Sequence, residues 1–310
     1  MHQGRLAYLG PAGTFTEEAV RTQADLAADT LVPQRSVPDV INAVESGECD
    51  RGVVPLENSI EGSVTVTLDA LAFDTQLLIR REIDLPITLN LCAKPGATLD
   101  AITTVASHPH AHAQCRLFMR SQLPDAVVEA ANSTSEAARD VAKGRSLTKA
   151  AICTRAAAEL YGLEVLVPEV QDHTGNVTRF VLVGHGIPAP TGHDKTSIVC
   201  FQREDRPGSL LAILAEFASR SINLNKLESR PTKASLGDYC FFIDFDGHIA
   251  DEIVADCLRN LSAKQADVKF LGSYPVAGDG AVPRRKAMSK RWRDANAWIN
   301  DLRNQIQDDQ

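Results

Sequence analysis

Short apolar runs alternate with amphipathic stretches over residues 1–76. Runs of this kind bounded by Gly or Pro predict buried strands, and the three-to-four-residue apolar spacing between them predicts helices. Strands and helices are expected in turn at Leu6–Leu9, Thr14–Ala28, Leu31–Gln34, Pro38–Ser46, Arg51–Pro55 and Ser63–Ala72. This order predicts an open, largely parallel sheet covered by helices on both faces, with ligands at the loops beyond the carboxyl ends of its strands.

A second set of alternating elements follows. Strands are expected at Ile87–Ala93, Thr103–Ala106, Ala126–Ala130 and Ala150–Cys153, and helices at Pro109–Gln122, Ser133–Val141 and Arg155–Tyr161. Ser133 followed three residues later by Glu136 matches the capping box that opens a helix. One further apolar strand, Thr178–Val183, lies between Gly175 and Gly184. Residues 77–184 therefore predict a second α/β body and one further strand.

The pattern changes after residue 184. Residues 185–194 are rich in Pro, Gly and His and show no periodicity, which is typical of a linker. Beyond them the expected order is βαββαβ, which predicts a ferredoxin-like α/β sandwich. Its elements are Thr196–Phe201, Ser209–Arg220, Leu224–Glu228, Tyr239–Phe245 (after a turn at 235–238), Ile249–Leu261 and Val268–Ser273.

Near the C-terminus, apolar residues recur at spacings of three and four, which predicts an amphipathic helix. They are Trp292, Ala295, Ile299, Leu302 and Ile306. We expect this helix to dock on its own chain or on a neighbouring subunit.

Composition narrows the class of protein. A chain of 310 residues predicts at least two domains, and its net charge of −8 argues against nucleic acid or an acidic membrane as a partner. No apolar run is long enough to span a bilayer, and the N-terminus does not resemble a signal peptide. The seven cysteines stand singly, without a CxxC motif, which indicates reduced thiols in a cytoplasmic protein.

Candidate chemistry gathers at the start of the strand at 178–183. Thr178 and Arg179 follow Asn176, so a hydroxyl, a guanidinium and an amide lie at the mouth of a buried element. A buried Arg needs an anionic partner, and on these residues alone that partner is either a carboxylate of the protein or a ligand.

Two segments resemble cofactor-binding motifs, one for a metal and one for a dinucleotide, but both are incomplete. His108, His110 and His112 alternate, but no nearby Cys or carboxylate completes a metal site. The segment 10–13, Gly-Pro-Ala-Gly, lacks the spacing of a dinucleotide-binding loop. We therefore expect neither a metal nor another cofactor.

Several motifs occur in an order that resembles one family. The chain is similar to the monofunctional prephenate dehydratases that carry a C-terminal ACT regulatory domain, over nearly all of residues 6–274. The motifs are GPAGTFT at 10–16, PLENSIEGS at 55–63, SHP at 107–109 with Gln114, STS at 133–135, NVTRF at 176–180, PGSL at 207–210 and ESRP at 228–231. Each motif alone is weak, but their joint order is specific.

The resemblance implies an α/β fold with a two-lobed catalytic domain like a type II periplasmic binding protein, and a cleft between the lobes. The domains would be 1–184 (lobe one about 1–76 and 170–184, lobe two about 77–169), linker 185–194, ACT domain 195–275 and tail 276–310. It also implies decarboxylating dehydration of prephenate to phenylpyruvate, CO2 and water, a step towards phenylalanine.

That reaction needs a site that binds a dianion, polarises the leaving hydroxyl and keeps the departing carboxylate poorly solvated. The resemblance assigns catalysis to Thr178 as hydrogen-bond donor, Glu57 as relay, and Arg179 as carboxylate ligand or as support for the Glu57 loop. Substrate-binding roles fall on Thr14, Asn58, Ser59, Ser107, Gln114, Asn176 and Phe180. Some relatives have an acidic residue where this chain has Asn132, which shifts weight to Glu57 or to water.

The ACT resemblance implies feedback inhibition by L-phenylalanine between paired ACT domains, and hence a homodimer or homotetramer. The residues implied in this allosteric site are Gly208, Ser209, Leu210, Asn223, Leu224, Glu228, Ser229 and Arg230. Two alternatives stay open: an arogenate dehydratase, whose substrate has an amine in place of the ketone, and a non-catalytic amino-acid sensor.

Overall fold

The computed structural model describes residues 4–202, 207–233, 238–278, 294 and 297–305. The chain divides into two compact units, one made of Met1–Thr75 with Ile83–Gly184 and the other of Gln76–Glu82 with His185–Gln310. Most of the turn expected at 235–238, and Trp292, Ala295 and Ile306 of the expected C-terminal helix, lie outside the described residues.

The first unit begins with lobe one, whose sheet has the strand order β2-β1-β3-β11-β5, with β4 paired to β3. Its strands are β1 (Arg5–Leu9), β2 (Thr30–Gln34), β3 (Arg51–Asn58), β4 (Gly62–Ser63), β5 (Leu78–Pro86) and β11 (Val177–Gly184). β5 belongs to this sheet and not to lobe two, where residues from 77 onwards were expected, and its residues up to Glu82 group with the second unit. Its helices are α1 (Phe15–Arg21), α2 (Ala24–Ala27), α3 (Val37–Glu45) and α4 (Thr65–Asp69), which continues as a π-helical turn at Ala70–Asp74.

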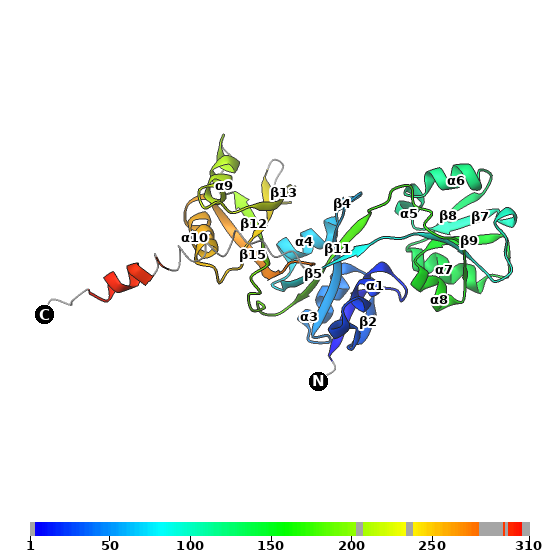
Figure 1. Cartoon of the computed structure of the whole chain (residues 1–310), viewed down its shortest axis with the longest axis horizontal. Coiled ribbons are helices and arrows are strands. Elements are labelled where there is room, and N and C mark those ends of the chain that lie inside the picture. Colours follow the sequence, from blue (N-terminus) through cyan, green and yellow to red (C-terminus); the bar gives the residue numbers. More distant parts are fainter. Residues whose placement is uncertain (1–3, 203–206, 234–237, 279–293, 295–296, 306–310) are drawn as a thin grey trace. The chain divides into compact units, whose positions relative to one another are not determined.

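The lobe-one sheet is mixed, which corrects the expectation of a largely parallel sheet. β1 is parallel to both β2 and β3, whereas β11 is antiparallel to β3. β11 differs because the chain builds lobe two first and re-enters lobe one from the opposite direction (Figure 1).

Lobe two is a five-stranded mixed sheet in the order β10-β6-β9-β7-β8. Its strands are β6 (Asn90–Ala93), β7 (Thr104–Ser107), β8 (Val127–Ala130), β9 (Lys149–Cys153) and β10 (Glu164–Val167). Its helices are α5 (Pro109–Ala113), α6 (Arg116–Gln122), α7 (Thr134–Lys143) and α8 (Arg155–Tyr161), with a 3-10 turn at Leu99–Ala101. Figure 1 shows α5 and α6 on one side of this sheet and α7 and α8 on the other.

Most expected elements are present, and the exceptions have physical reasons. The helix expected at 109–122 is two helices, because the chain turns at Gln114 and Cys115 and starts a new helix at Arg116. The helix expected at 14–28 also ends early, at Arg21. β5 was not anticipated, since Arg80, Arg81 and Glu82 interrupt its apolar pattern; β4 and β10 were missed because each is short.

Lobe two holds a tight turn of lobe one. The hydroxyl of Thr154 donates to the backbone oxygen of Gly13 at 3.0 Å, and the hydroxyl of Ser135 donates to the backbone oxygen of Ala12. Gly13 has a φ of +80°, and a Cβ there would lie 3.1 Å from Cα of Ala157. Only glycine meets both demands without strain.

The second unit contains a four-stranded sheet in the order β13-β14-β12-β15. Its elements are β12 (Asp194–Gln202), α9 (Ser209–Ala218), β13 (Leu224–Pro231), β14 (Tyr239–Asp246), α10 (Glu252–Asn260), a π-helical turn at Leu261–Gln265, and β15 (Ala266–Pro275). The order βαββαβ with the first strand between the third and the fourth confirms the ferredoxin-like sandwich. Its core includes Ile198, Phe217, Phe245 and Leu261.

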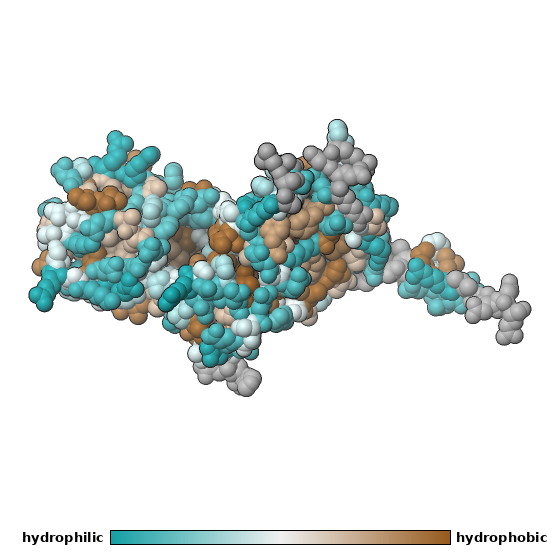
Figure 2. All heavy atoms as spheres, turned by 180° about the vertical axis from the view of Figure 1, so that it is seen from behind, coloured by the Kyte–Doolittle hydropathy of each residue, from teal (hydrophilic) through white to brown (hydrophobic). Residues whose placement is uncertain are grey.

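Residues 297–303 near the C-terminus are helical. Trp298 and Leu302 on this helix are 61% and 43% exposed, and Figure 2 shows the apolar side chains of the segment standing among polar ones. No helix in the described part of the chain is long and apolar enough to cross a membrane.

We expect Gly13→Ala to lower the free energy of unfolding by about 1–3 kcal/mol more than Gly47→Ala. Both glycines have positive φ, but nothing lies within 4 Å of a Cβ at Gly47, whereas one at Gly13 would press on Ala157. Urea unfolding of the two variants measures the difference. Equal losses would show that the turn and α8 are not in close contact.

Candidate active site

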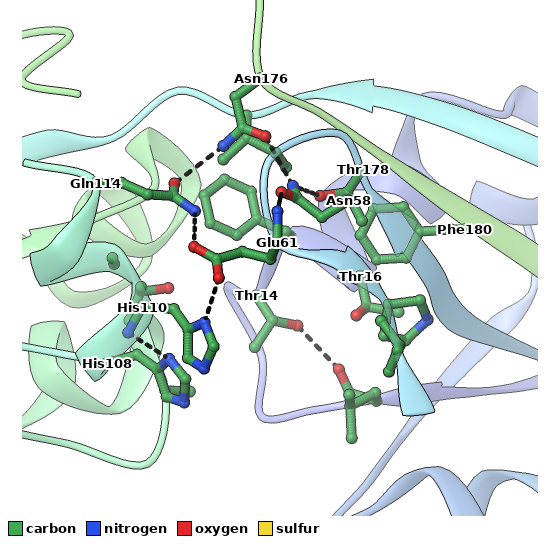
Figure 3. Close-up of a pocket in the computed structure, with 18 of the residues that line it drawn as sticks. Thr14, Thr16, Asn58, Glu61, His108, His110, Gln114, Asn176, Thr178 and Phe180 are labelled. Carbon is green, nitrogen blue, oxygen red and sulfur yellow. Dashed lines mark hydrogen bonds and ion pairs between the residues drawn. The ribbon is translucent and has the colours of Figure 1, made fainter. Parts of the chain in front are cut away.

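A cavity of about 590 Å3 lies within the first unit and is lined by residues of both lobes. Figure 3 shows that its polar side chains converge from the two lobes towards its centre. Its lining is Leu9, Gly10, Thr14, Phe15, Thr16, Arg35, Pro55, Asn58, Glu61, Gly62, Ser63, Val64, Ile87, Leu89, His108, His110, Ala111, Gln114, Asn132, Ser133, Thr134, Asn176, Thr178 and Phe180.

Strand alternation decides which side chains of β11 reach the cavity. Thr178 and Phe180, two residues apart, line it, and both are at least nine-tenths buried. Arg179 between them is not part of the lining and forms an ion pair with Glu57, at 3.8 Å. In the register of the two strands Thr178 lies opposite Asn58, and Arg179 opposite Glu57. Side chains on successive residues point to opposite faces, so the two pairs are separated.

The amide of Asn58 determines how the Thr178 hydroxyl is oriented. Its Oδ1 accepts the backbone N–H groups of Ile60 and Glu61, both at 3.0 Å, so its Nδ2 must face the other way. That nitrogen donates to Oγ1 of Thr178 at 2.8 Å and to Oδ1 of Asn176 at 2.7 Å. Because Oγ1 is an acceptor in this contact, the hydroxyl proton of Thr178 stays available for a partner in the cavity.

The hydrogen-bonded chain continues from lobe one into lobe two. Nδ2 of Asn176 donates to Oε1 of Gln114 at 3.0 Å, and Nε2 of Gln114 donates to Oε1 of Glu61 at 3.1 Å. The other carboxylate oxygen of Glu61 lies 3.0 Å from Nδ1 of His110. The two ends of the chain determine which amide atoms donate and which accept. At one end a backbone N–H must donate to Asn58, and at the other end the carboxylate of Glu61 must accept from Gln114 (Figure 3).

Four titratable or charged side chains line the cavity: Arg35, Glu61, His108 and His110. The hydrogen bonds from Gln114 and then from His110 lower the pKa of Glu61, so this group is ionised at neutral pH. Burial, and to a lesser extent the neighbouring His110, lowers the pKa of His108. The two imidazole rings stack with centroids 5.2 Å apart.

A cationic side chain of lobe one and a helix N-terminus of lobe two both line the cavity. Arg35 precedes helix α3 in lobe one, is exposed, and has no hydrogen bond or ion pair with any other residue that the structure describes. In lobe two the cavity is lined by Asn132, Ser133 and Thr134, which form the start of α7. A helix N-terminus carries partial positive charge and can receive an anion together with a cationic side chain.

The structure brings together six of the residues expected at the catalytic site. Thr14, Asn58, Gln114, Asn176, Thr178 and Phe180 all line the cavity.

Four other expected residues are not in the cavity lining. Glu57 and Arg179 form the ion pair described above. Ser107 is fully buried and donates to the backbone oxygen of Ile152 at 2.7 Å. The hydroxyl of Ser59 accepts the backbone N–H of Val177 at 3.0 Å.

Arg35, Glu61, His110 and the residues at the start of α7 line the cavity but were not among the site residues expected from the sequence. Glu61 falls inside the PLENSIEGS motif, which was the available signal, but Glu57 was chosen from that motif. Nothing in the sequence around Arg35 indicates that it lines the cavity.

No cluster of His, Cys, Asp or Glu in the described part of the chain could hold a metal ion. His112, the third histidine of the alternating set, lies 3.4 Å from the backbone oxygen of Glu129 through its Nε2.

A second cavity, of about 600 Å3, lies in the second unit beside the start of α9. Gly208 begins this helix with φ of +91°, and open space surrounds the position of a Cβ. The lining includes Gly208, Ser209, Leu210 and Ser229 of the expected allosteric set, and Gln202, Leu211, Leu214, Tyr239 and Phe241 besides.

The other members of the expected allosteric set lie outside this second lining. Glu228 forms ion pairs with Lys226 at 3.2 Å and Arg230 at 3.7 Å. Asn223 and Leu224 precede them at the start of β13 and do not line the cavity.

Comparison with known proteins gives consistent matches along the chain. The family model for prephenate dehydratase matches residues 6–187, and the ACT domain model matches residues 196–263. The prephenate dehydratase of Mycolicibacterium vanbaalenii is 44% identical over 304 residues, covering 93% of this chain and 96% of the relative.

Comparison with solved structures gives the same family. The prephenate dehydratase of Arthrobacter aurescens in complex with L-Phe has a TM-score of 0.87 at 40% identity, covering 97% of this chain and 99% of that one. GqqA, described as a novel type of quorum-quenching acylase, has a TM-score of 0.78 at 30% identity, covering 91% and 99%. The chain belongs to the prephenate dehydratase family and carries a C-terminal ACT domain.

Proposed function

We propose that the chain is a prephenate dehydratase that converts prephenate to phenylpyruvate in L-phenylalanine biosynthesis. The observation that carries this proposal is the Thr178 hydroxyl, held by Asn58 so that its proton is available inside a cavity shared by the two lobes. The family membership supplies the substrate class.

The reaction requires one proton and no redox change. The prephenate dianion loses its ring carboxylate as CO2, and the electrons of the broken C–C bond enter the ring as the hydroxyl at the opposite carbon departs. Adding one proton to that oxygen releases water and leaves the phenylpyruvate anion. The protein therefore has to donate to the leaving oxygen and to hold the retained carboxylate.

Thr178 is assigned the hydrogen bond to the leaving hydroxyl. A threonine hydroxyl is too weak an acid to transfer its proton unaided, so its contribution is oriented polarisation of the departing oxygen, with water as the proton source. The apolar lining, which includes Phe15, Val64, Ile87 and Phe180, would keep the ring carboxylate poorly solvated and so favour its loss as neutral CO2.

Arg35 and the N-terminus of α7 are assigned to the side-chain carboxylate that the product keeps. The ring carboxylate leaves as CO2, so binding it with a guanidinium would stabilise the substrate more than the transition state and slow the reaction. Arg35 is exposed and has no described partner of its own, so binding an anion breaks no existing ion pair.

The family motifs assign Glu57 and Arg179 to the catalytic site, and we keep that assignment. Their ion pair, on the opposite face of the two strands from Thr178, supports a role in fixing β3 against β11. This is the second of the two roles considered for Arg179, support of the segment that carries Glu57.

L-Phenylalanine is the proposed feedback inhibitor, bound at the cavity beside Gly208 in the ACT domain. The L-Phe complex of the Arthrobacter aurescens protein supports the ligand. We propose a homodimer or homotetramer paired through the ACT domains, since β13 is an edge strand and Leu227 on it is 43% exposed. All seven cysteines are free and buried, which supports a cytoplasmic location.

The direct test is to incubate the purified chain with prephenate and follow phenylpyruvate by its absorbance, with and without L-phenylalanine. Arogenate in parallel distinguishes an arogenate dehydratase. Absence of turnover on both substrates, with L-phenylalanine still bound, would favour the sensor alternative.

Thr178→Ala should lower kcat about 10²–10³-fold while the fold is retained, because a preorganised donor to the leaving oxygen is lost. Thr178→Ser keeps the hydroxyl and the contact with Asn58, and should stay within about tenfold of wild type. Steady-state kinetics on both variants measures the difference. Near-wild-type turnover by a folded Thr178→Ala would remove Thr178 from the chemistry.

Arg35→Gln should raise KM for prephenate about tenfold or more, with a smaller change in kcat, since one charged contact to the retained carboxylate disappears. Arg120→Gln, an exposed Arg on α6 outside the cavity lining, is the matched control and should leave KM unchanged. The same KM for both variants would assign the carboxylate to other groups.

Ser229→Val should weaken inhibition by L-phenylalanine about tenfold or more while basal turnover stays intact, because Ser229 lines the ACT cavity. Glu228→Gln, the preceding residue outside that lining, is the control for general disturbance of β13. Calorimetric titration with L-phenylalanine measures both. A larger loss for Glu228→Gln would move the site to the other face of the strand.

A further inference from the structure

Glu61 joins the two lobes by side-chain contacts of its own. It stands between β3 and β4 in lobe one, yet both of its carboxylate oxygens contact lobe two. One meets Nδ1 of His110 at 3.0 Å, and the other accepts from Nε2 of Gln114 at 3.1 Å. Figure 3 shows Glu61 projecting between these two side chains, with Gln114 continuing to Asn176.

The lobes also meet through the Asn176–Gln114 hydrogen bond, which shares Gln114 with Glu61, and at the turn around Gly13, which differs from Glu61 in exposure. Ser135 and Thr154, which bind that turn, are fully buried. The side chains of His110 and Glu61 are 63% and 36% exposed. Water can replace the partners of an exposed pair at little cost in free energy. Separating the buried contact would leave the hydroxyl groups of Ser135 and Thr154 without hydrogen-bond acceptors. The contact at Glu61 can therefore open while the turn at Gly13 persists, and the Asn176–Gln114 hydrogen bond opens with it when Gln114 moves away.

We propose that Glu61 is a positioning residue that clamps His110 and Gln114 and thereby closes lobe two over the cavity. Closure does two things that the open form cannot. It fixes the amide of Gln114, which in turn accepts from Asn176, and it limits the access of water to the cavity. Release of the clamp opens the cavity for exchange of ligand. The consequence for turnover rests on the proposed function, whereas the closure itself does not.

A glutamate suits this role for a geometric reason. Two donors from lobe two have to be accepted at once, and a carboxylate offers an oxygen to each. A glutamine side chain has one acceptor oxygen, so it can accept from only one of the two donors. Alanine can accept from neither. The series Glu, Gln, Ala should therefore show graded loss of closure.

The experiment measures the distance between the lobes directly, by electron paramagnetic resonance between two spin labels. The labels are placed at Asn42→Cys on α3 and Gln122→Cys on α6, two exposed positions outside the cavity lining. The native cysteines are all buried, so the introduced thiols react selectively. Glu61→Gln, Glu61→Ala and His110→Ala are made in this background.

Glu129→Gln is the matched control, because Glu129 forms an ion pair with Lys149 inside lobe two. Wild type and the control should share a dominant short-distance population. Glu61→Ala should move at least half of that population to longer distances, with Glu61→Gln intermediate. In a double-mutant cycle, His110→Ala should add little once Glu61 is already alanine.

An unchanged distance distribution in folded Glu61→Ala would overturn the clamp, as would an equal shift in Glu129→Gln. Prephenate turnover is recorded on the same samples. If wild type shows no turnover, the proposed function fails, but the distances still decide whether Glu61 closes the cavity. If wild type turns over, Glu61→Ala should lose about tenfold or more in kcat/KM, while inhibition by L-phenylalanine persists.

Discussion

The active cavity depends on the orientation of one amide, that of Asn58. Two backbone N–H groups from Ile60 and Glu61 fix its oxygen, and its nitrogen is thereby directed at Thr178 and Asn176. A buried hydroxyl can donate or accept, and which it does is set by its neighbours. Here the neighbour is a donor, so the proton of Thr178 is directed to whatever occupies the cavity. The catalytic proposal follows from that single constraint.

The same turn that orients Asn58 also carries Glu61, and this couples the Thr178 hydroxyl to the position of lobe two. The chain of side chains from Thr178 through Asn58, Asn176 and Gln114 to Glu61 begins and ends in lobe one, and Gln114 is its lobe-two member. A hydrogen-bonded network with every amide satisfied is rigid, because turning one group would leave its neighbours unpaired. A catalytic site that relies on oriented donors, with no bound cofactor proposed, benefits from such rigidity.

Much of the fold and part of the cavity lining could be predicted from the sequence. Strand alternation explains why two of the expected residues lie outside the lining. The order of elements, the ferredoxin-like unit, and the cavity positions of Thr178 and Asn58 follow from periodicity and motifs. Arg179 and Glu57, which were also expected at the catalytic site, lie outside the cavity lining, because successive strand residues face opposite ways. Had the period of two been applied, only every second residue of NVTRF could have been placed in the cavity.

The remaining features depend on contacts between segments far apart in the chain. Arg35 and Glu61 line a cavity that lobe two also lines, and β11 pairs with β3 from a distant part of the chain. Gln114 reaches across because the helix expected at 109–122 is interrupted there. β5 stayed hidden because charged residues inside it break the apolar pattern. Local periodicity carries no information on such long-range pairing.

The most direct test of the central claim is the rate of phenylpyruvate formation by Asn58→Asp. The substitution preserves size and the acceptor for the N–H groups of Ile60 and Glu61, but it replaces the donor to Thr178 with an anionic acceptor. The Thr178 proton should then turn to the new carboxylate, and kcat should fall about a hundredfold or more with the fold retained. Wild-type turnover by this variant would contradict the account, because Thr178 would then act without being oriented by Asn58.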